Sequence, residues 1–567
     1  MCLIYSKPMK SSLLVLAMIL GSSASSIASA QAADDPIKYD TTGGEASGVP
    51  KLNLPITEGP FKPAWESLES QYQFPEWFRD AKFGIWAHWG FGSFDPQGYY
   101  PVNHGVTANP SATPSLKGAK DAVLDFKAEH LDPVKLLTFY KENGAHYFMA
   151  LANHHDNFDN WHSKYQPWNS VNLGPHRDLI AEWQAAAKKL GLRFGVSSHA
   201  ARAWEWYEVS QGVDKNGIPY DGNLTRADGK GLWWEGYDPQ DLYAQNHKPA
   251  AFSWDWDPKV TSTPSAAYME RFYLRHKQLY EDYHPDMVYF DDRTLPFHGI
   301  TDQVGLALAA DIYNANIKEK GKLDVVINSK FLDLDERKAM VSDFERSRAH
   351  RIRPEPWQTD TCIGDWFYDK AHLEKHDYRQ APDLIRMLID IVSKNGNLML
   401  SIPLRQDGTP DDDEIGIVKG IGTWLKVNGE AIFATRPWKI YGEGPSVLDT
   451  DLFAGDAGGG LLDIPNKPYT SQDIRFTQSK DGKTLYAIAM DYPRDGKIVV
   501  KSLATGVGKV NQVSLYGYQG KLDWRQTADG VMITMPTDEP YDFAYAFKIL
   551  GEDLKPVANT TQSITTK

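Results

Sequence analysis

Short apolar runs alternate with amphipathic stretches of helical period from about residue 75 to about residue 435. Apolar runs that are rich in β-branched and aromatic residues predict strands. We expect strands at 83–89, 146–153, 193–198, 287–291, 325–328 and 398–402. Strands that alternate with helices in this way are typical of parallel βαβ units.

The stretches between these runs carry helix start and stop signals. Asp132 is placed to cap a helix that Pro133 opens and Gly144 closes, and Asp178 to cap one that ends at Gly191. The same signals predict two further helices, at 263–285 and 382–396. Six or more such units fit a (β/α)8-type barrel better than a doubly wound sheet, because no glycine-rich phosphate loop follows the first strand.

After Pro437 the pattern changes to short alternating strands with polar turns, at 484–490, 497–503, 510–515 and 531–535. We therefore predict an α/β fold in which the barrel is followed by a C-terminal all-β sandwich. The sandwich is interpreted as structural support, with an accessory sugar-binding surface as the alternative. Two long segments without regular period, about 100–128 and 207–262, are expected to be loops over the barrel; the second contains Trp233-Trp234 and Trp254-Asp255-Trp256.

The N-terminal segment has the features of a secretory signal. Lys7 and Lys10 precede the apolar run 13–20, and small residues follow it up to about residue 32. The run is too short to cross a bilayer of roughly 30 Å. Cleavage would leave Cys362 as the only cysteine, so we expect a soluble, secreted and periplasmic protein without an intrachain disulfide.

The charge balance excludes two classes of partner. A net charge of -14 and a pI near 5.6 are contrary to the clustered basic surface that nucleic acids or anionic membranes require. The chain also holds 18 Trp and 28 Tyr. Aromatic faces stack on sugars, so this content is compatible with carbohydrate binding, although additional core aromatics explain it as well.

Acidic residues end one of the predicted strands, and active sites of such barrels lie at the C-terminal strand ends. The run 285–292 finishes with Asp291 and Asp292. Neighbouring strand residues point to opposite sides, so only one of the two can face the barrel mouth while the other caps the next turn. A carboxylate there could serve the pair that glycosidic bond hydrolysis needs.

Histidines end the first two strands. His88 is followed by Trp89, and His154 by His155. A zinc site is disfavoured because neighbouring strand residues diverge and neither His-Glu-x-x-His nor a cysteine pair is present. We expect no metal and no cofactor, and we interpret the histidines as ligands of sugar hydroxyls.

Five segments in the same order resemble motifs of glycoside hydrolase family 29, the α-L-fucosidases. The resemblance covers about residues 75–550. The segments are Trp77-Phe78 with Ala81–Ile85 and His88-Trp89-Gly90, then His154-His155-Asp156 with Phe158, Tyr289-Phe290-Asp291, 393–400 and 428–433. The resemblance implies that Asp291 is the nucleophile, that His88, His154 and His155 bind sugar hydroxyls, and that Tyr289 stands where a tryptophan lines the pocket.

The chain departs from the family pattern near these motifs. Asn153 and Asn157 flank the histidine pair, the family's Tyr-Tyr-Ser is 197–199 with His199 at its end, and Asn-Asp-Arg is 328–330 with Lys330 at its end. Ser401-Ile402-Pro403-Leu404 stands for Asn-Ile-Gly-Pro. These changes leave the reaction class intact but leave the sugar open among L-fucose, L-galactose and L-glucose.

The family does not hold its general acid/base at one fixed motif. The family's Trp-Glu is Trp357-Gln358 here, and Asp343-Phe344-Glu345 matches its Asp-x-Glu region. We assign Glu345, with Asp343, Glu355 and Asp360 as alternatives; Glu345 could otherwise form a surface salt bridge with Arg346 or Arg348. Trp89, His199 and Trp357 are counted with the substrate-binding residues.

Together these features predict a signal peptide at 1–32, an N-terminal extension at 33–74, a catalytic domain at 75–436, the sandwich at 437–555 and a polar tail at 556–567. The resemblance implies an exo-acting retaining hydrolase that releases terminal α-L-fucose. Alternatives are another α-L-hexoside hydrolase and a non-catalytic sugar-binding protein. The expected partner is a carbohydrate, and the sequence leaves a homo-oligomer open.

Overall fold

The structure of the protein is a computed structural model that describes residues 49–94, 118–213, 216–250, 260–446, 468–537 and 543–557. The predicted signal segment and Trp254-Asp255-Trp256 lie outside the described residues.

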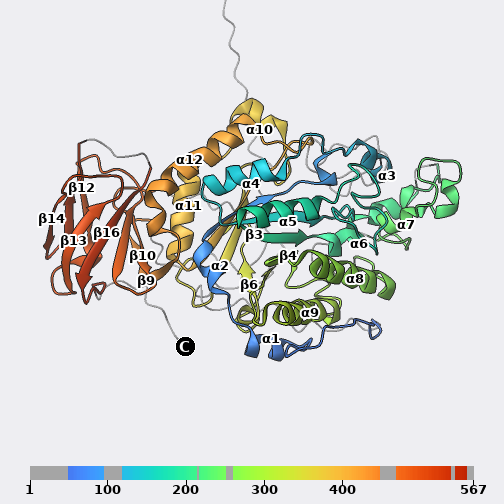
Figure 1. Ribbon diagram of the computed structural model, residues 1–567, viewed down its shortest axis with the longest axis horizontal. Helices are drawn as coiled ribbons and strands as arrows, with labels where there is room; N and C mark the ends of the chain where they lie inside the picture. Colours follow the sequence, from blue (N-terminus) through green and yellow to red (C-terminus); the bar gives the residue numbers. More distant parts are fainter. Residues whose placement is uncertain are drawn as a thin grey trace, which may run out of the picture.

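Eight parallel strands form a closed barrel in sequence order, with β1 hydrogen-bonded to both β2 and β8 (Figure 1). The predicted barrel is therefore confirmed. Its strands are β1 Phe83–Ala87, β2 Tyr147–Asn153, β3 Arg193–Ser198, β4 Met287–Arg293, β5 Val326–Lys330, β6 Val341–Asp343, β7 Trp357–Cys362 and β8 Gly396–Ser401.

Two of these strands, β6 and β7, were not predicted. β6 has only three residues, and β7 has the sequence WQTDTC, in which polar residues dominate. Neither produces an apolar run, although every residue of both strands is buried. The buried polar residues of β6 and β7 include two acids that belong to the site described below.

Helices surround the barrel, and their ends follow the capping signals of the sequence. The Asp132 carboxylate accepts the Lys135 N–H, and the Asp178 carboxylate accepts the Ala181 N–H. Gly191 ends its helix with φ of +69°, a conformation that favours glycine. The longer helices are α4 Pro133–Glu142, α5 Leu179–Leu190, α8 Ala266–Tyr283, α9 Gln303–Lys320, α11 Ala381–Ser393 and α12 Asp412–Asn428; the shorter ones are α1 Trp65–Gln71, α2 Glu76–Ala81, α3 Ala119–Ala122, α6 Ala203–Trp206, α7 Pro239–Leu242 and α10 Lys370–Lys375.

The interior of the barrel is filled by large side chains, among them Trp86, Tyr147 and Tyr289. Glycine makes room for one of them, since a Cβ on Gly84 would lie 2.2 Å from a ring carbon of Tyr147. The Tyr147 ring thus crosses the barrel, and its hydroxyl donates to Oε1 of Gln358 on β7. A polar layer therefore lies inside the barrel beneath the mouth.

The C-terminal region forms two antiparallel sheets that enclose their own hydrophobic core. The larger sheet has the order β13-β16-β11-β10-β9 and the smaller β12-β15-β14. Their strands are β9 Thr435–Glu443, β10 Ile474–Ser479, β11 Thr484–Ala489, β12 Lys497–Val500, β13 Lys509–Leu515, β14 Asp523–Thr527, β15 Gly530–Thr534 and β16 Tyr545–Glu552. The predicted all-β sandwich is confirmed.

Helices α11 and α12 lie between the barrel and the larger sheet (Figure 1). Asp390 of α11 connects the barrel helices to the larger sheet: Nε of Arg475 on β10 donates a hydrogen bond to its carboxylate over 2.7 Å. Burial alone would raise the pKa of Asp390, but Lys394, Arg348 and Arg475 together hold it below its usual value. An ionised carboxylate thus joins the two parts of the chain.

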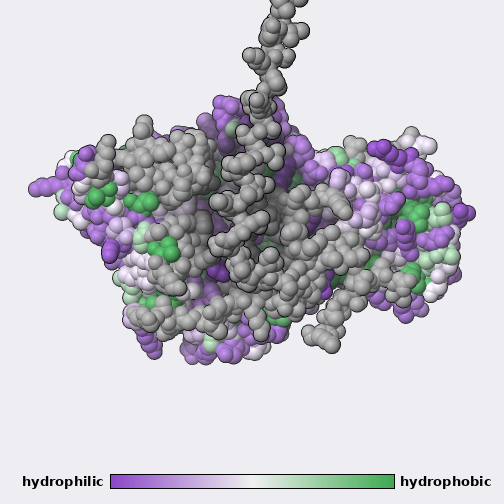
Figure 2. Space-filling model, turned by 180° about the vertical axis from the view of Figure 1, so that it is seen from behind, coloured by the Kyte–Doolittle hydropathy of each residue, from purple (hydrophilic) through white to green (hydrophobic). Residues whose placement is uncertain are grey.

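The described surface is mainly hydrophilic on the face that Figure 2 shows, and its hydrophobic residues form small separate patches. No helix within the described ranges has both the length and the apolar character needed to cross a bilayer.

Candidate active site

Asp291 and Asp292 diverge at the end of β4. Asp292 points away from the mouth: its Oδ1 lies 2.8 Å from Nε of Arg202 and accepts the N–H of Arg293. Its side chain is 3 % exposed, whereas that of Asp291 is 24 % exposed. Only Asp291 can therefore be reached by a molecule in the barrel mouth.

Both carboxylate oxygens of Asp291 are held by cationic or hydrogen-bonding groups. Nζ of Lys330 lies 2.5 Å from Oδ1, and Nε2 of His199 lies 2.8 Å from Oδ2. Burial alone would raise the pKa of Asp291, but Lys330 and His199 outweigh it and hold the pKa well below its usual range. Asp291 is thus ionised at neutral pH, as a nucleophile must be.

Lys330 also contacts the carboxylate of Glu345, with Nζ 2.5 Å from Oε2. Since this oxygen and Oδ1 of Asp291 both lie 2.5 Å from one nitrogen, they are at most twice that distance, 5.0 Å, apart. Burial raises the pKa of Glu345, although Lys330 opposes the shift, and the charges of Asp360 and Asp291 raise it further. The site therefore holds one carboxyl group with a lowered pKa beside one with a raised pKa.

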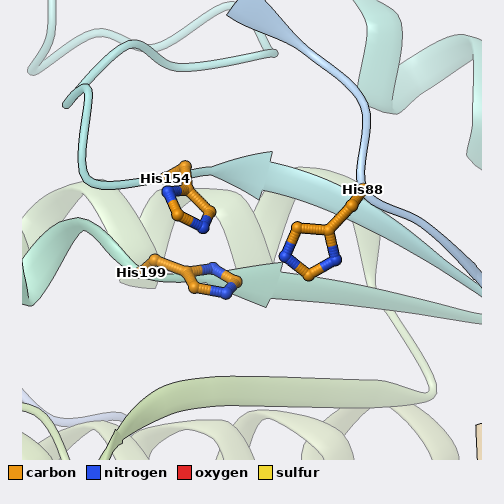
Figure 3. Close-up of side chains that lie close together, drawn as sticks. All are labelled: His88, His154 and His199. Carbon is orange, nitrogen blue, oxygen red and sulfur yellow. The ribbon is translucent and has the colours of Figure 1, made fainter. Parts of the chain in front are cut away.

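Three histidines converge from the ends of adjacent strands: His88 after β1, His154 after β2 and His199 after β3 (Figure 3). His199 places this group beside Asp291. The rings of His154 and His199 stack with centroids 4.1 Å apart. Burial, with His199 as the next cause, lowers the pKa values of His88 and His154 well below the usual value. Each of these two neutral rings offers one N–H donor and one acceptor nitrogen, which suits sugar hydroxyls.

His155 lies beside this group and is fixed by the backbone. Its Nδ1 is 3.0 Å from the carbonyl oxygen of His199, and its ring centroid is 4.8 Å from that of Trp206. Burial lowers the pKa of His155 to about 3. The carbonyl accepts a hydrogen bond, so Nδ1 carries the proton and Nε2 is the acceptor nitrogen.

The same geometry could accommodate a metal ion. His88, His154 and His199 each offer a ring nitrogen, and these nitrogens all lie within 4.8 Å of one another. Adjacent residues of one strand diverge, whereas these three histidines follow three different strands and bring their ring nitrogens together. A metal there would occupy the space next to Asp291, and chelation tests this directly.

Tyr289 connects the site to the polar layer inside the barrel. Its hydroxyl lies 3.3 Å from Oδ1 of Asp291 and 3.1 Å from Oδ2 of Asp360. Asp360 is in turn hydrogen-bonded to Asp343, and Nε2 of Gln358 donates to Asp343 over 2.6 Å. Burial and the charge of Asp360 raise the pKa of Asp343 well above its usual value.

Two of the predicted substrate-binding residues lie away from this group. Trp357 begins β7, at the end of the barrel opposite the mouth, and its indole N–H donates to the carbonyl of Lys394. Its ring packs edge-on against Phe344 in the layer between strands and helices. The assignment of Trp357 is therefore wrong: its side chain is turned outward from the start of the strand.

The indole of Trp89 is likewise turned into the hydrophobic layer. It packs against Phe126, and its N–H donates to the carbonyl of Arg405. Trp89 is 2 % exposed, so it supports the loop after β1 rather than lining the mouth. The predicted contact of Trp89 with substrate is therefore wrong, because its indole points away from the side that His88 faces.

Sequence reasoning missed three residues of the site. In the sequence, Lys330 is recognisable only as a departure from the family's Asn-Asp-Arg motif. Trp366 and Phe367 follow the unpredicted strand β7, and their ring centroids lie 5.2 Å and 5.3 Å from that of His88. The aromatic run 366–368 was the available signal, but without β7 it could not be placed at a strand end.

In the long loop after β3, two adjacent tryptophans have different surroundings. Trp233 is 41 % exposed and its indole N–H donates to Asp121, whereas Trp234 is buried with Nζ of Lys120 5.6 Å from its ring centroid. Of these two residues, Trp233 is the one available at the surface for an aromatic contact with a ligand.

Family comparisons match both parts of the chain. The alpha-L-fucosidase family model matches residues 50–430, and the model of the alpha-L-fucosidase C-terminal domain matches residues 466–550. The first match alone spans more than half of the chain.

Individual proteins agree with this result. The alpha-L-fucosidase of Branchiostoma floridae is 26% identical over 520 residues, 87% of this chain and 96% of that protein. The tissue alpha-L-fucosidase of Homo sapiens is 24% identical, over 87% and 92% of the two chains. The structure of Thermotoga maritima alpha-fucosidase in complex with fucose superposes with a TM-score of 0.60 at 22% identity, covering 86% of this chain and 100% of the other. A trapped covalent intermediate of a Bacteroides thetaiotaomicron alpha-L-fucosidase gives 0.55 at 15% identity, covering 88% and 99%.

Proposed function

The chain belongs to the alpha-L-fucosidase family of glycoside hydrolases, and on this premise we propose that it releases terminal α-L-fucose by a retaining, double-displacement mechanism. The relatives named above support L-fucose as the sugar that is released, and the arrangement of the carboxyl groups supports the retaining mechanism.

One observation carries the proposal: Asp291 and Glu345 share Lys330, with carboxylate oxygens no more than 5.0 Å apart. Retaining glycosidases hold their two carboxyl groups about 5 Å apart, while inverting ones leave roughly 6.5–9.5 Å for a water molecule. The opposite pKa shifts of Asp291 and Glu345 agree with the roles of nucleophile and acid.

In the first step an oxygen of Asp291 attacks the anomeric carbon while the bond to the leaving oxygen breaks. Glu345 gives its proton to that oxygen, so Asp291 loses its charge as Glu345 becomes charged. Lys330 contacts both carboxyl groups and stabilises the negative charge before and after this transfer. The product of the step is a fucosyl ester of Asp291.

In the second step Glu345 takes a proton from water, and the water oxygen attacks the same carbon. The ester bond breaks and its electron pair returns to Asp291. Two inversions at one carbon give net retention. His88, His154 and His155 are assigned to the sugar hydroxyls, and His199 both orients Asp291 and stacks on His154.

The test combines a substrate panel with product stereochemistry. Nitrophenyl α-L-fucoside, α-L-galactoside and α-L-glucoside are compared side by side, with the β-L-fucoside as the linkage control. We expect the highest kcat/KM for the α-L-fucoside, and α-L-fucose as the first product in a time-resolved NMR experiment. A preference for another α-L-hexoside would contradict the proposed substrate, and β-L-fucose as the first product would contradict the retaining mechanism. Binding of these glycosides without turnover would show a sugar-binding protein instead of an enzyme.

We also propose that the N-terminal segment directs export to the periplasm and is removed. Amino-terminal sequencing of the protein from a periplasmic fraction should find a start near residue 31 or 33. A cytoplasmic protein that retains this segment would contradict the proposal.

A further inference from the structure

The Tyr289 hydroxyl lies between two carboxylates, one at the barrel mouth and one deeper in the barrel. Asp291 Oδ1 is 3.3 Å away and Asp360 Oδ2 is 3.1 Å away. Tyr289 and Asp291 are two residues apart on β4 and so share its inward face. A phenol carries one proton and donates it to one acceptor at a time.

Asp360 belongs to a chain of hydrogen-bonded side chains inside the barrel. Asp360 and Asp343 are hydrogen-bonded through their side chains, Gln358 donates to Asp343, and Tyr147 donates to Gln358. Asp343 and Asp360 are 3 % and 1 % exposed, so this pair is shielded from water. Burial and the neighbouring Asp360 raise the pKa of Asp343 well above its usual value, and the Tyr289 hydroxyl donates to Asp360.

The ionisable neighbours of Tyr289 come from the four strands β4 to β7 and from the loop after β6. Asp291 lies on β4, Lys330 ends β5 with Nζ 5.9 Å from the Tyr289 ring centroid, and Asp360 lies on β7. Beyond burial, the carboxyl groups of Asp343 and Glu345 also raise the pKa of the phenol. The uncharged Trp86 packs edge-on at 5.2 Å.

We propose that Tyr289 is a positioning residue whose hydroxyl proton turns between Asp291 and Asp360 as the charge on Asp291 changes. When Asp291 is a free carboxylate, the phenol donates to it. When Asp291 is esterified, the phenol donates to Asp360, whose charge keeps this buried donor paired.

The inference rests on the proposed double displacement and assigns the phenol an unequal effect on its two steps. In the second step the ester bond breaks and the electron pair moves to the departing Asp291 carboxylate. The phenol hydrogen bond to Asp291 forms again as this charge develops, so it lowers the barrier of that step. In the first step the same bond is lost, so it does not favour attack.

A purely steric role for Tyr289 makes a different prediction. The ring fills the barrel beside Trp86, and phenylalanine would fill the same space without the hydroxyl. If only the ring matters, Tyr289→Phe should leave the balance between the two steps unchanged.

The experiment measures the two steps separately with a dinitrophenyl α-L-fucoside, whose leaving group needs no protonation. For Tyr289→Phe we expect the second step to slow on the order of tenfold to a hundredfold, with the first step unchanged or faster. A burst of dinitrophenol should appear, and intact-protein mass spectrometry should show more fucosyl-enzyme than in the unaltered protein. For Asp360→Asn we expect the reverse, less fucosyl-enzyme and a slower first step, because the esterified state loses the charged acceptor of the phenol.

Tyr313→Phe is the matched control. Tyr313 is equally buried, and its hydroxyl donates to the carbonyl of Ala339 in the layer outside the barrel. This variant loses one buried phenol hydrogen bond and should keep the ratio of the two rates.

Equal slowing of both steps in Tyr289→Phe, or accumulation of fucosyl-enzyme in both Tyr289→Phe and Asp360→Asn, would overturn the inference while leaving the proposed function intact. If the unaltered protein hydrolyses no fucoside and forms no fucosyl-enzyme, the proposed function fails and the inference fails with it.

Discussion

Lys330 lies at the end of β5 with its ammonium nitrogen 2.5 Å from Oδ1 of Asp291 at the end of β4. The same nitrogen contacts Glu345, so one cation serves both carboxyl groups of the proposed reaction. Its charge lowers the pKa of Asp291 and opposes the burial that raises that of Glu345.

Replacing Lys330 should move the whole pH profile. The reaction needs Asp291 ionised, a form present above its lowered pKa, and Glu345 protonated, a form present below its raised pKa. Lys330 lowers both pKa values, so Lys330→Met should shift both limbs of the kcat/KM profile to higher pH, by about one unit or more. Lys330→Arg keeps the charge and should leave the limbs near their original positions. A lower rate with unmoved limbs would mean that Lys330 acts through shape alone.

Removing Glu345 should have a leaving-group signature. In Glu345→Ala a dinitrophenyl fucoside should still form the fucosyl-enzyme, because this leaving group needs no proton, whereas a natural disaccharide should react at least about a hundredfold more slowly. The second step should stall, and azide should restore turnover as α-L-fucosyl azide, because azide needs no deprotonation and attacks the β-linked fucosyl-enzyme with a second inversion. Equal loss on both substrates without azide rescue would make Glu345 structural, and Asp343, Glu355 and Asp360 would be tested in the same way.

The histidine group gives opposite expectations for a metal enzyme and for sugar binding. We expect kcat/KM to survive prolonged chelation, because His88 and His154 are neutral rings assigned to sugar hydroxyls. The measurement is activity and metal content of the same sample before and after dialysis against chelator. Activity that disappears on dialysis and returns with zinc would show a metal at His88, His154 and His199.

The contact between the barrel and the sandwich should depend on Asp390. Asp390→Asn leaves Arg475 and Lys394 without their buried counter-charge and should lower the free energy of unfolding by about 3–5 kcal/mol. The stabilisation by Asp390 is present above the ordinary aspartate pKa and is lost as pH falls through its lowered value. Calorimetric unfolding of both proteins measures the difference. Asp383→Asn, on the exposed side of the same helix, is the control and should change stability by no more than about 0.5 kcal/mol. If Asp390→Asn and Asp383→Asn were equally stable, Asp390 would not stabilise the contact between the barrel and the sandwich.

Much of the fold followed from the sequence because apolar runs and capping residues are local signals. The run 287–291 predicted β4, and Asp178 with Gly191 predicted both ends of α5. The signal failed where strands are polar. β6 and β7 carry the buried acids Asp343 and Asp360. Asp343 accepts a hydrogen bond from Gln358 on the neighbouring strand, and Asp360 accepts one from Tyr289 across the barrel.

The site was predictable where a residue follows an apolar strand and not where side-chain direction decides. Asp291, His88 and His154 follow such strands and meet at the mouth. Trp89 and Trp357 stand in motifs of the same family, yet both indoles are turned into the hydrophobic layer. The bridging of two carboxyl groups by Lys330 requires contacts among three strands or loops, which no spacing along the chain reveals.

The most direct test of the account is to trap the fucosyl-enzyme and find the residue that carries it. With 2-deoxy-2-fluoro-α-L-fucosyl fluoride, the first step should outrun the second, and peptide mass spectrometry should place the sugar on Asp291. Asp291→Asn is nearly isosteric, so it should fold normally, form no adduct and lose at least about a thousandfold in kcat. An adduct on Asp292 or Asp360, or near-native turnover by Asp291→Asn, would contradict the account.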